Sequence, residues 1–166
     1  MKQSETEIFS VCGMPDLSYI RANNMLTHSL EKVVKLASLY GIGSVSSWTF
    51  VMEFFGWRQF QNRKEVGALA GLTPTPYDSG KSLREQGISK AGNHRIRALA
   101  VEIAWSWLRF QPQSNLSQWF IKRYANGGKR MRRIGIVAVA RRLLIDLWRY
   151  LEYDKIPEGA RLKSAA

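Results

Sequence analysis

The sequence predicts an all-α fold, and three observations support this prediction. Apolar residues recur at intervals of three and four along most of the 166-residue chain, as on one face of a helix. No segment combines alternating apolar and polar residues with bounding turns, which is the pattern typical of strands. Hydrophobic residues make up 45% of the chain, enough for a real core. We expect a helical domain with a helix-hairpin-helix-like element and long basic C-terminal helices.

The first helices follow a leader without periodicity, residues 1–20, that contains glycine and proline. Residues 21–40 are predicted to form an amphipathic helix, because Leu30, Val33 and Val34 lie among its helically spaced apolar positions. Gly41-Ile42-Gly43 ends this helix, and Ser44 is the predicted cap of the next one.

The remaining helices are separated by glycine and proline. A short helix is predicted from Asn62, as its cap, to Gly71. The strongest helical stripe starts after Asn93 and ends near Pro112. Two further helices are expected, over about 115–126 and 130–153. The apolar stripe of the second consists of Ile136, Ala140, Leu143, Leu144, Leu147 and Leu151. The predicted organisation is a leader (1–20), a linker helix remnant (21–40), a core (41–112) and a basic helical extension (113–166).

The charge of the chain indicates a polyanionic partner. The net charge is +12, and between Lys81 and Arg142 fourteen lysines and arginines face only Glu85 and Glu102. Such a field attracts nucleic acid phosphates. Cys12 is the only cysteine, so an internal disulfide is excluded and a reducing compartment is favoured. Neither a signal peptide nor a membrane span is predicted, and we expect a cytoplasmic protein without membrane partners.

Ser79 is the main candidate for chemistry. It lies between Asp78 and Gly80 in a proline-rich segment, 73–80, which cannot be regular helix because each proline disfavours helical backbone before it. We therefore expect Ser79 on a loop or short turn, and Ser82 and Ser89 are the alternative candidates for the nucleophile. Ordinary serines beside glycine are mostly turn residues, and Asp78 and His94 are only candidate general bases. The cations predicted to surround a phosphate here are Lys81, Arg84, Lys90, Arg95 and Arg97.

This segment resembles the C-terminal domain of the insertion sequence one-ten transposases, the bridge-RNA-guided recombinases. Gly71-Leu72 with Pro74, Ser79-Gly80, Ile88-Ser89-Lys90, and Gly92-Asn93 with Arg97 fall in the family's order and spacing. The resemblance covers roughly residues 35–110. It implies that Ser79 is the nucleophile that becomes covalently linked to DNA during strand exchange.

The resemblance also implies a RuvC-like nuclease domain with metal-binding carboxylates, for which this sequence has no counterpart. The acids before Gly41 are too few and lack strand-like surroundings to build a two-metal site. We therefore expect the C-terminal part alone, with no cofactor in this chain and Mg²⁺ confined to the missing domain. A guide RNA and full-length transposase subunits are further candidate partners beside DNA.

Two more groups of residues are candidate phosphate contacts. Gly41 and Gly43 have the spacing of a helix-hairpin-helix, whose backbone N–H groups bind phosphate, although an ordinary turn between helices has the same pattern. Four cations lie at the predicted start of the last helix, where the helix dipole disfavours them by roughly 0.3–1 kcal/mol each. They are Lys129, Arg130, Arg132 and Arg133.

The tryptophans are mostly expected in the core. Trp48 and Trp107 fall on apolar helical stripes, whereas Trp57 and Trp105 remain open as base-stacking residues.

The sequence thus predicts a DNA-binding transposase fragment whose Ser79 is the nucleophile in DNA recombination. The alternatives are a non-catalytic nucleic-acid-binding module and a regulatory fragment that joins full-length transposases.

Overall fold

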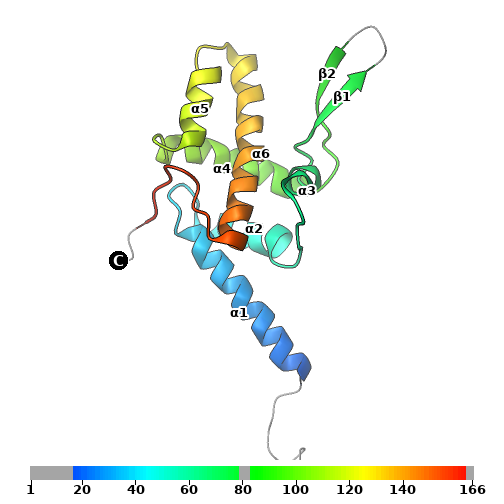
Figure 1. Cartoon of the computed structure of the whole chain (residues 1–166), viewed down its shortest axis with the longest axis vertical. Coiled ribbons are helices and arrows are strands. Elements are labelled where there is room, and N and C mark those ends of the chain that lie inside the picture. Colours follow the sequence, from blue (N-terminus) through cyan, green and yellow to red (C-terminus); the bar gives the residue numbers. More distant parts are fainter. Residues whose placement is uncertain (1–16, 79–82, 164–166) are drawn as a thin grey trace, which may run out of the picture.

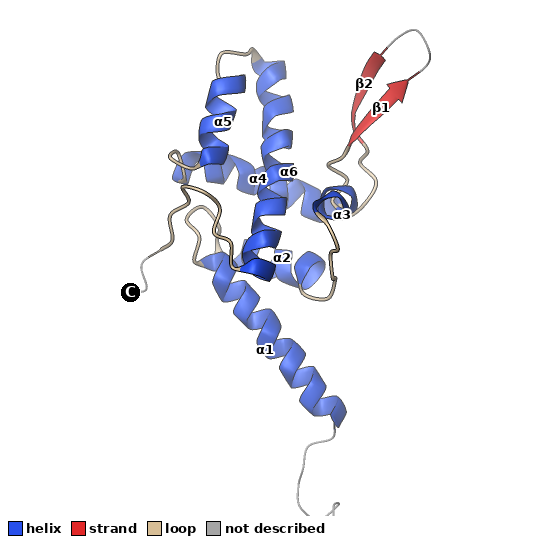
Figure 2. Ribbon diagram, viewed as in Figure 1, coloured by secondary structure: helices blue, strands red, loops and turns tan. Residues whose placement is uncertain are grey.

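The computed structural model describes residues 17–78 and 83–163, and its fold is mostly helical, as predicted (Figures 1 and 2). The elements in chain order are α1 (Leu17–Ala37), α2 (Ser44–Phe50), the π-helical η2 (Val51–Phe55), α3 (Arg63–Leu69), β1 (Pro74–Asp78), β2 (Leu83–Ile88), α4 (His94–Phe110), α5 (Asn115–Tyr124) and α6 (Lys129–Tyr153).

Helix α6 forms the centre of the fold and packs against α4, α5, α3 and α1. Its buried side chains follow the predicted stripe, and the stripe of α4 faces them with Ile96, Ala100, Ala104 and Trp107. The buried α6 residues of the predicted stripe are Ile136, Ala140, Leu143, Leu144, Leu147 and Leu151. Burial of a side chain of this size stabilises a fold by ~1.5–3 kcal/mol, so the α4–α6 contact holds the rest of the molecule in place.

The helix starts are encoded by asparagine and serine caps in three cases. Asn62 accepts hydrogen bonds from the Lys64 and Glu65 amides, which confirms the predicted cap of α3. Asn93 does the same for α4, and Ser114 accepts from the Ser117 amide at α5. The prediction for Ser44 is wrong: α2 begins at Ser44 itself, and Gly43 occupies the cap position without a side-chain bond.

Segment 74–88 differs from the sequence prediction, which expected no strand. β1 and β2 form an antiparallel hairpin with Tyr77 opposite Arg84 and Asp78 opposite Leu83, and its register shifts between Pro74 and Pro76. In a sheet of only two strands each strand has an outer edge, where a proline without an N–H costs no ladder bond. The prolines exclude a helix here but permit this ribbon.

The end of the described chain returns to the turn between α1 and α2. Leu162 pairs with Leu39, and the Tyr40 amide donates to the Arg161 carbonyl over 3.2 Å. Lys163 Nζ donates to the carbonyls of Ala37 and Ile42, at 2.6 and 2.8 Å, where the last carbonyls of α1 lack helical partners. The tail therefore closes the C-terminal end of α1.

Helix α1 leaves the body of the molecule at the end opposite the hairpin (Figure 1). In its last turns Lys32 and Leu36 are buried, whereas Leu26, Leu30 and Val34 are exposed. No helix in the described residues is both long and apolar enough to span a lipid bilayer.

Candidate nucleic-acid interface

At the base of the β1–β2 hairpin, residues 69–71 lie directly against residues 90–93, and we call these two segments the foot of the hairpin. Gly92, with φ +117°, lies so close to α3 that a Cβ would be 2.2 Å from the Leu69 carbonyl oxygen. Gly71, with φ +68°, would place a Cβ 2.4 Å from the Ala91 carbonyl oxygen. Both positions need a positive φ and the absence of a side chain, which only glycine supplies. The Asn93 amide then donates to Leu69 over 2.9 Å and joins the α4 cap to the end of α3.

The side chain of Arg97 joins the two segments of the foot. Its Nη1 lies 3.0 Å from the Lys90 carbonyl oxygen and 3.5 Å from that of Ala70, so it bridges the two sides of the foot. The Lys90 amide in turn donates to Gly71 over 3.1 Å, and Lys90 has a positive φ of +54° with an exposed side chain. The guanidinium of Arg97 thus donates hydrogen bonds to the backbone of the hairpin foot.

Arg95, at the start of α4, has a carboxylate partner. Its Nη1 lies 2.8 Å from Glu53 Oε1, and its side chain is 69% exposed. An ion pair this exposed contributes little to stability, so it leaves the guanidinium accessible to an anion.

Ser79 and Lys81 lie outside the described residues, as does the rest of segment 79–82, which joins Asp78 to Leu83. Arg84 is described only through its backbone, which pairs with Tyr77. His94, a candidate general base, is the first residue of α4 and is exposed. Of the sequence-predicted cations, Lys90 and Arg97 therefore lie at the foot of the hairpin, and Arg95 lies at the start of α4, where it pairs with Glu53.

The Gly41-Ile42-Gly43 turn is tied into the fold through its carbonyls. The Gly41 oxygen accepts from Ser106 Oγ over 2.8 Å, and the Gly43 oxygen accepts from Ser47 Oγ over 2.8 Å. Gly41 has φ +88° and packs against α4, whereas a Cβ on Gly43 would have no neighbour within 4 Å. The two glycines thus differ: Gly41 is needed for the turn, and Gly43 leaves an open approach to the start of α2.

Gln111 secures the same turn, a role that no sequence pattern indicates. It is 1% exposed, and its Nε2 donates to the carbonyls of Tyr40 and Arg161 while its Oε1 accepts from the Arg161 amide. A polar residue placed just after an apolar stripe carries no periodic signal, so only the tertiary structure shows this role.

The basic start of α6 is exposed and unpaired. Lys129, Arg130, Arg132 and Arg133 are all exposed, and within the described residues none of them forms an ion pair. The first turn of α6 contains no acid, and Gly128 offers no side-chain cap. The dipole penalty expected from the sequence is therefore not offset by a neighbouring carboxylate. This end of α6 and the hairpin lie at the same end of the long axis (Figure 1).

The tryptophans divide differently from the prediction. Trp107 is buried as expected, but Trp48 is 47% exposed, so its assignment to the core is wrong. The buried residues of α2, which packs against α1 and α4, are Ser47 and Phe50. Trp57 and Trp105 are both exposed, and the Arg58 guanidinium lies 4.2 Å from the centre of the Trp57 ring.

Comparison with known proteins places these features in one family. The profile described as "Transposase IS116/IS110/IS902 family" matches residues 34–118, from the end of α1 through the hairpin to α5. "Putative transposase y4rJ" of Sinorhizobium fredii (strain NBRC 101917 / NGR234) is 44% identical over 130 residues, which are 78% of this chain and 33% of that protein.

Two further relatives match a shorter stretch. "Putative transposase y4qE" of the same strain is 35% identical over 51% of this chain and 22% of its own length. "Transposase for insertion sequence element IS1328" of Yersinia enterocolitica is 29% identical over 54% of this chain and 27% of its own length. The chain thus aligns with about a third or less of each relative. Because the family profile covers about half of the chain, including the hairpin and its foot, the chain belongs to the IS116/IS110/IS902 transposase family.

Proposed function

We propose that this chain is the DNA-binding, serine-bearing part of a transposase and that Ser79 is its nucleophile. The observation that carries the proposal is the family match across the hairpin, whose strands flank Ser79 in the sequence. The rigid foot supports it, because Gly71, Gly92 and Arg97 fix how the hairpin leaves the helical body. A nucleophile must approach the phosphodiester in one defined geometry, and a fixed support for the hairpin provides this.

In the proposed step, Ser79 Oγ attacks the phosphorus of a DNA phosphodiester. The Oγ–P bond forms, the bond to one deoxyribose oxygen breaks, and that oxygen takes up a proton while the serine proton passes to a base. Lys81, Arg84, Lys90 and Arg95 offset the charge that gathers on the phosphoryl oxygens. The proposal assigns the divalent metal, and the guide RNA that acts with it, to a RuvC-like domain.

DNA binding through charge is the first test. The net charge of +12 and the four unpaired cations at the start of α6 predict that log affinity for duplex DNA falls linearly with log salt, by ~0.9 for each phosphate contact. Fluorescence anisotropy with two unrelated labelled duplexes, between low and physiological salt, measures this slope. A flat titration for both duplexes would remove DNA binding from the proposal.

The open approach at Gly43 supports a second candidate function, a nucleic-acid-binding module without catalysis. Gly43→Ala adds a methyl group where nothing lies within 4 Å, so the fold should tolerate it while a phosphate approaching the α2 amides is displaced. We expect affinity for unrelated duplexes to fall equally, by a few-fold, with an unchanged circular dichroism spectrum. Unchanged affinity in Gly43→Ala would mean that the turn has only a structural role.

A further inference from the structure

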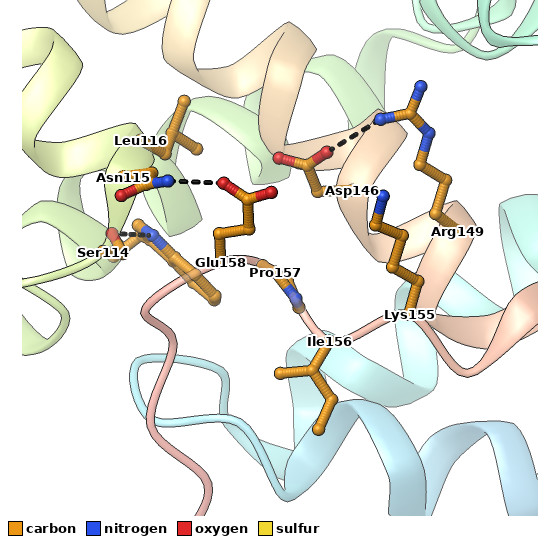
Figure 3. A pocket seen from close by; sticks show the side chains of 10 residues that line it. Ser114, Asn115, Leu116, Asp146, Arg149, Lys155, Ile156, Pro157 and Glu158 are labelled. Atoms are coloured by element: carbon orange, nitrogen blue, oxygen red, sulfur yellow. Dashed lines mark hydrogen bonds and ion pairs between the residues drawn. The ribbon is translucent and has the colours of Figure 1, made fainter.

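A cleft on the face of the molecule formed by α5, α6 and the start of α3 is distinct from the hairpin and from the basic end of α6. It has a volume of about 340 Å³ and is lined by Arg63, Asn115, Leu116, Arg142, Ile145, Asp146 and Arg149. An adjoining inner pocket of about 210 Å³ shares four of these residues and continues to the segment after α6 (Figure 3).

The outer cleft gathers cations from two elements. Arg142, Asp146 and Arg149 lie at intervals of four and three along α6, which places them on one face of the helix, and Arg63 faces them from α3. Within the described residues, neither Arg63 nor Arg142 forms an ion pair. Both arginines are exposed, so an anion can reach them from solvent.

Arg142 is also held in position. Its guanidinium lies 3.8 Å from the centre of the Trp119 ring, a distance at which the ring face attracts the cation. Stacking fixes the plane of the guanidinium and leaves its N–H groups free at the edge, which is the arrangement that binds phosphate oxygens in pairs. The first turn of α5, at Asn115 and Leu116, adds the positive end of its dipole to the same cleft.

The two pockets differ in their balance of charge. Glu158 lines only the inner pocket, where it accepts a hydrogen bond from the Asn115 amide group, and Asp146 lies 3.7 Å from Arg149 (Figure 3). Burial raises the pKa of Asp146, and the charges of Arg149 and Arg142 oppose this rise. In the inner pocket Asp146 and Glu158 offset Arg149 and Lys155, whereas in the outer cleft Asp146 is the one acid beside three arginines. The favourable position for an anion is therefore the outer cleft, beside Arg63 and Arg142.

We propose that this outer cleft binds a backbone phosphate of DNA, with Arg63 and Arg142 as the principal contacts and Arg149 as a third cation. The inference rests on the proposed DNA-binding function and adds to it a contact surface separate from the hairpin, the Gly43 turn and the start of α6. Because the contact is to a phosphate, it positions the DNA strand and reads no bases.

The test uses the full chain with a labelled duplex and the double variant Arg63→Gln/Arg142→Gln. Its control is Lys64→Gln/Arg109→Gln, which removes the same charge from exposed residues that do not line the cleft. We expect the cleft variant to bind about tenfold more weakly and its salt slope to fall by ~0.9 for each phosphate that it no longer neutralises, with a smaller change in the control. Equal changes in the two variants would overturn the inference, and a steep slope in the wild-type chain would show that the proposed function still stands.

Asp146→Asn gives a readout that a merely structural role would not produce. Removing the one acid that lines the outer cleft should tighten DNA binding by ~3-fold, because the repulsion of a nearby phosphate is removed. The gain should disappear when Arg63 and Arg142 are also replaced. An unchanged or weaker affinity in Asp146→Asn, with an unchanged circular dichroism spectrum, would contradict the inference.

Inorganic pyrophosphate distinguishes a backbone contact from a site for a free phosphate compound. We expect the wild-type chain to bind DNA nearly as strongly in millimolar pyrophosphate as in chloride of equal ionic strength. Tight pyrophosphate binding that depends on Arg63 and Arg142, with normal DNA affinity in the double variant, would replace the DNA contact by a small-molecule site. Loss of RNA binding alone in the double variant would likewise overturn the assignment to DNA.

Discussion

Gly92→Ala should destabilise the chain by about 2–4 kcal/mol, because it combines a strained backbone with a collision that cannot be relieved by a side-chain rotation. The new Cβ would lie 2.2 Å from the Leu69 carbonyl oxygen at a residue whose φ is +117°. That carbonyl already accepts the Asn93 amide, so moving it weakens the joint between α3 and α4 as well. Urea unfolding followed by circular dichroism measures the loss.

Gly43→Ala is the matched control for this stability experiment, since a Cβ there meets nothing within 4 Å and φ is −88°. We expect its free energy of unfolding to stay within ~1 kcal/mol of the wild-type value. If Gly92→Ala unfolded at the same urea concentration as Gly43→Ala, the close approach of α3 and the hairpin foot would not exist in solution. The hairpin would then lack the fixed support on which the proposed chemistry depends.

Ser79→Ala should abolish the covalent protein–DNA product completely. A fusion of this chain to a RuvC-like domain, supplied with its guide RNA and target DNA, should form an adduct that survives a denaturing gel, and the alanine variant should form none. The substitution removes only the attacking oxygen, so DNA affinity should be unchanged. This separation of binding from chemistry is what distinguishes a nucleophile from a DNA contact.

Neighbouring hydroxyls and cations complete the Ser79 experiment. Ser82→Ala and Ser89→Ala should leave the adduct in place. Arg95→Ala should slow its formation because a positive charge is removed, whereas Arg97→Ala should also lower stability, because Arg97 holds the carbonyls of Lys90 and Ala70. An adduct formed by the Ser79→Ala protein would rule out Ser79 as the nucleophile and leave the binding-module function.

The sequence by itself determined most of the helical framework. The apolar stripe of α4 and that of α6 predicted buried faces that the structure confirms, because residues three and four apart necessarily share one side of a helix. The cap at Asn62 was also predicted, since a short polar side chain before an apolar stripe satisfies the first free amides of a helix. The excess of positive charge over the second half of the chain follows directly from the number of lysines and arginines in the sequence.

Tertiary structure decided which apolar positions are covered and which cations are occupied. Periodicity predicts a face but not a neighbour, so Trp48 and Leu30 carry the pattern of core residues and remain exposed. The sequence predicts both Arg97 and Lys129 as phosphate contacts, yet Arg97 donates to two carbonyls at the hairpin foot, whereas Lys129 is exposed. The β1–β2 ribbon escaped prediction because its prolines and charged residues lack alternation. The cleft of Arg63 and Arg142 joins positions 79 residues apart, and only folding brings such positions together.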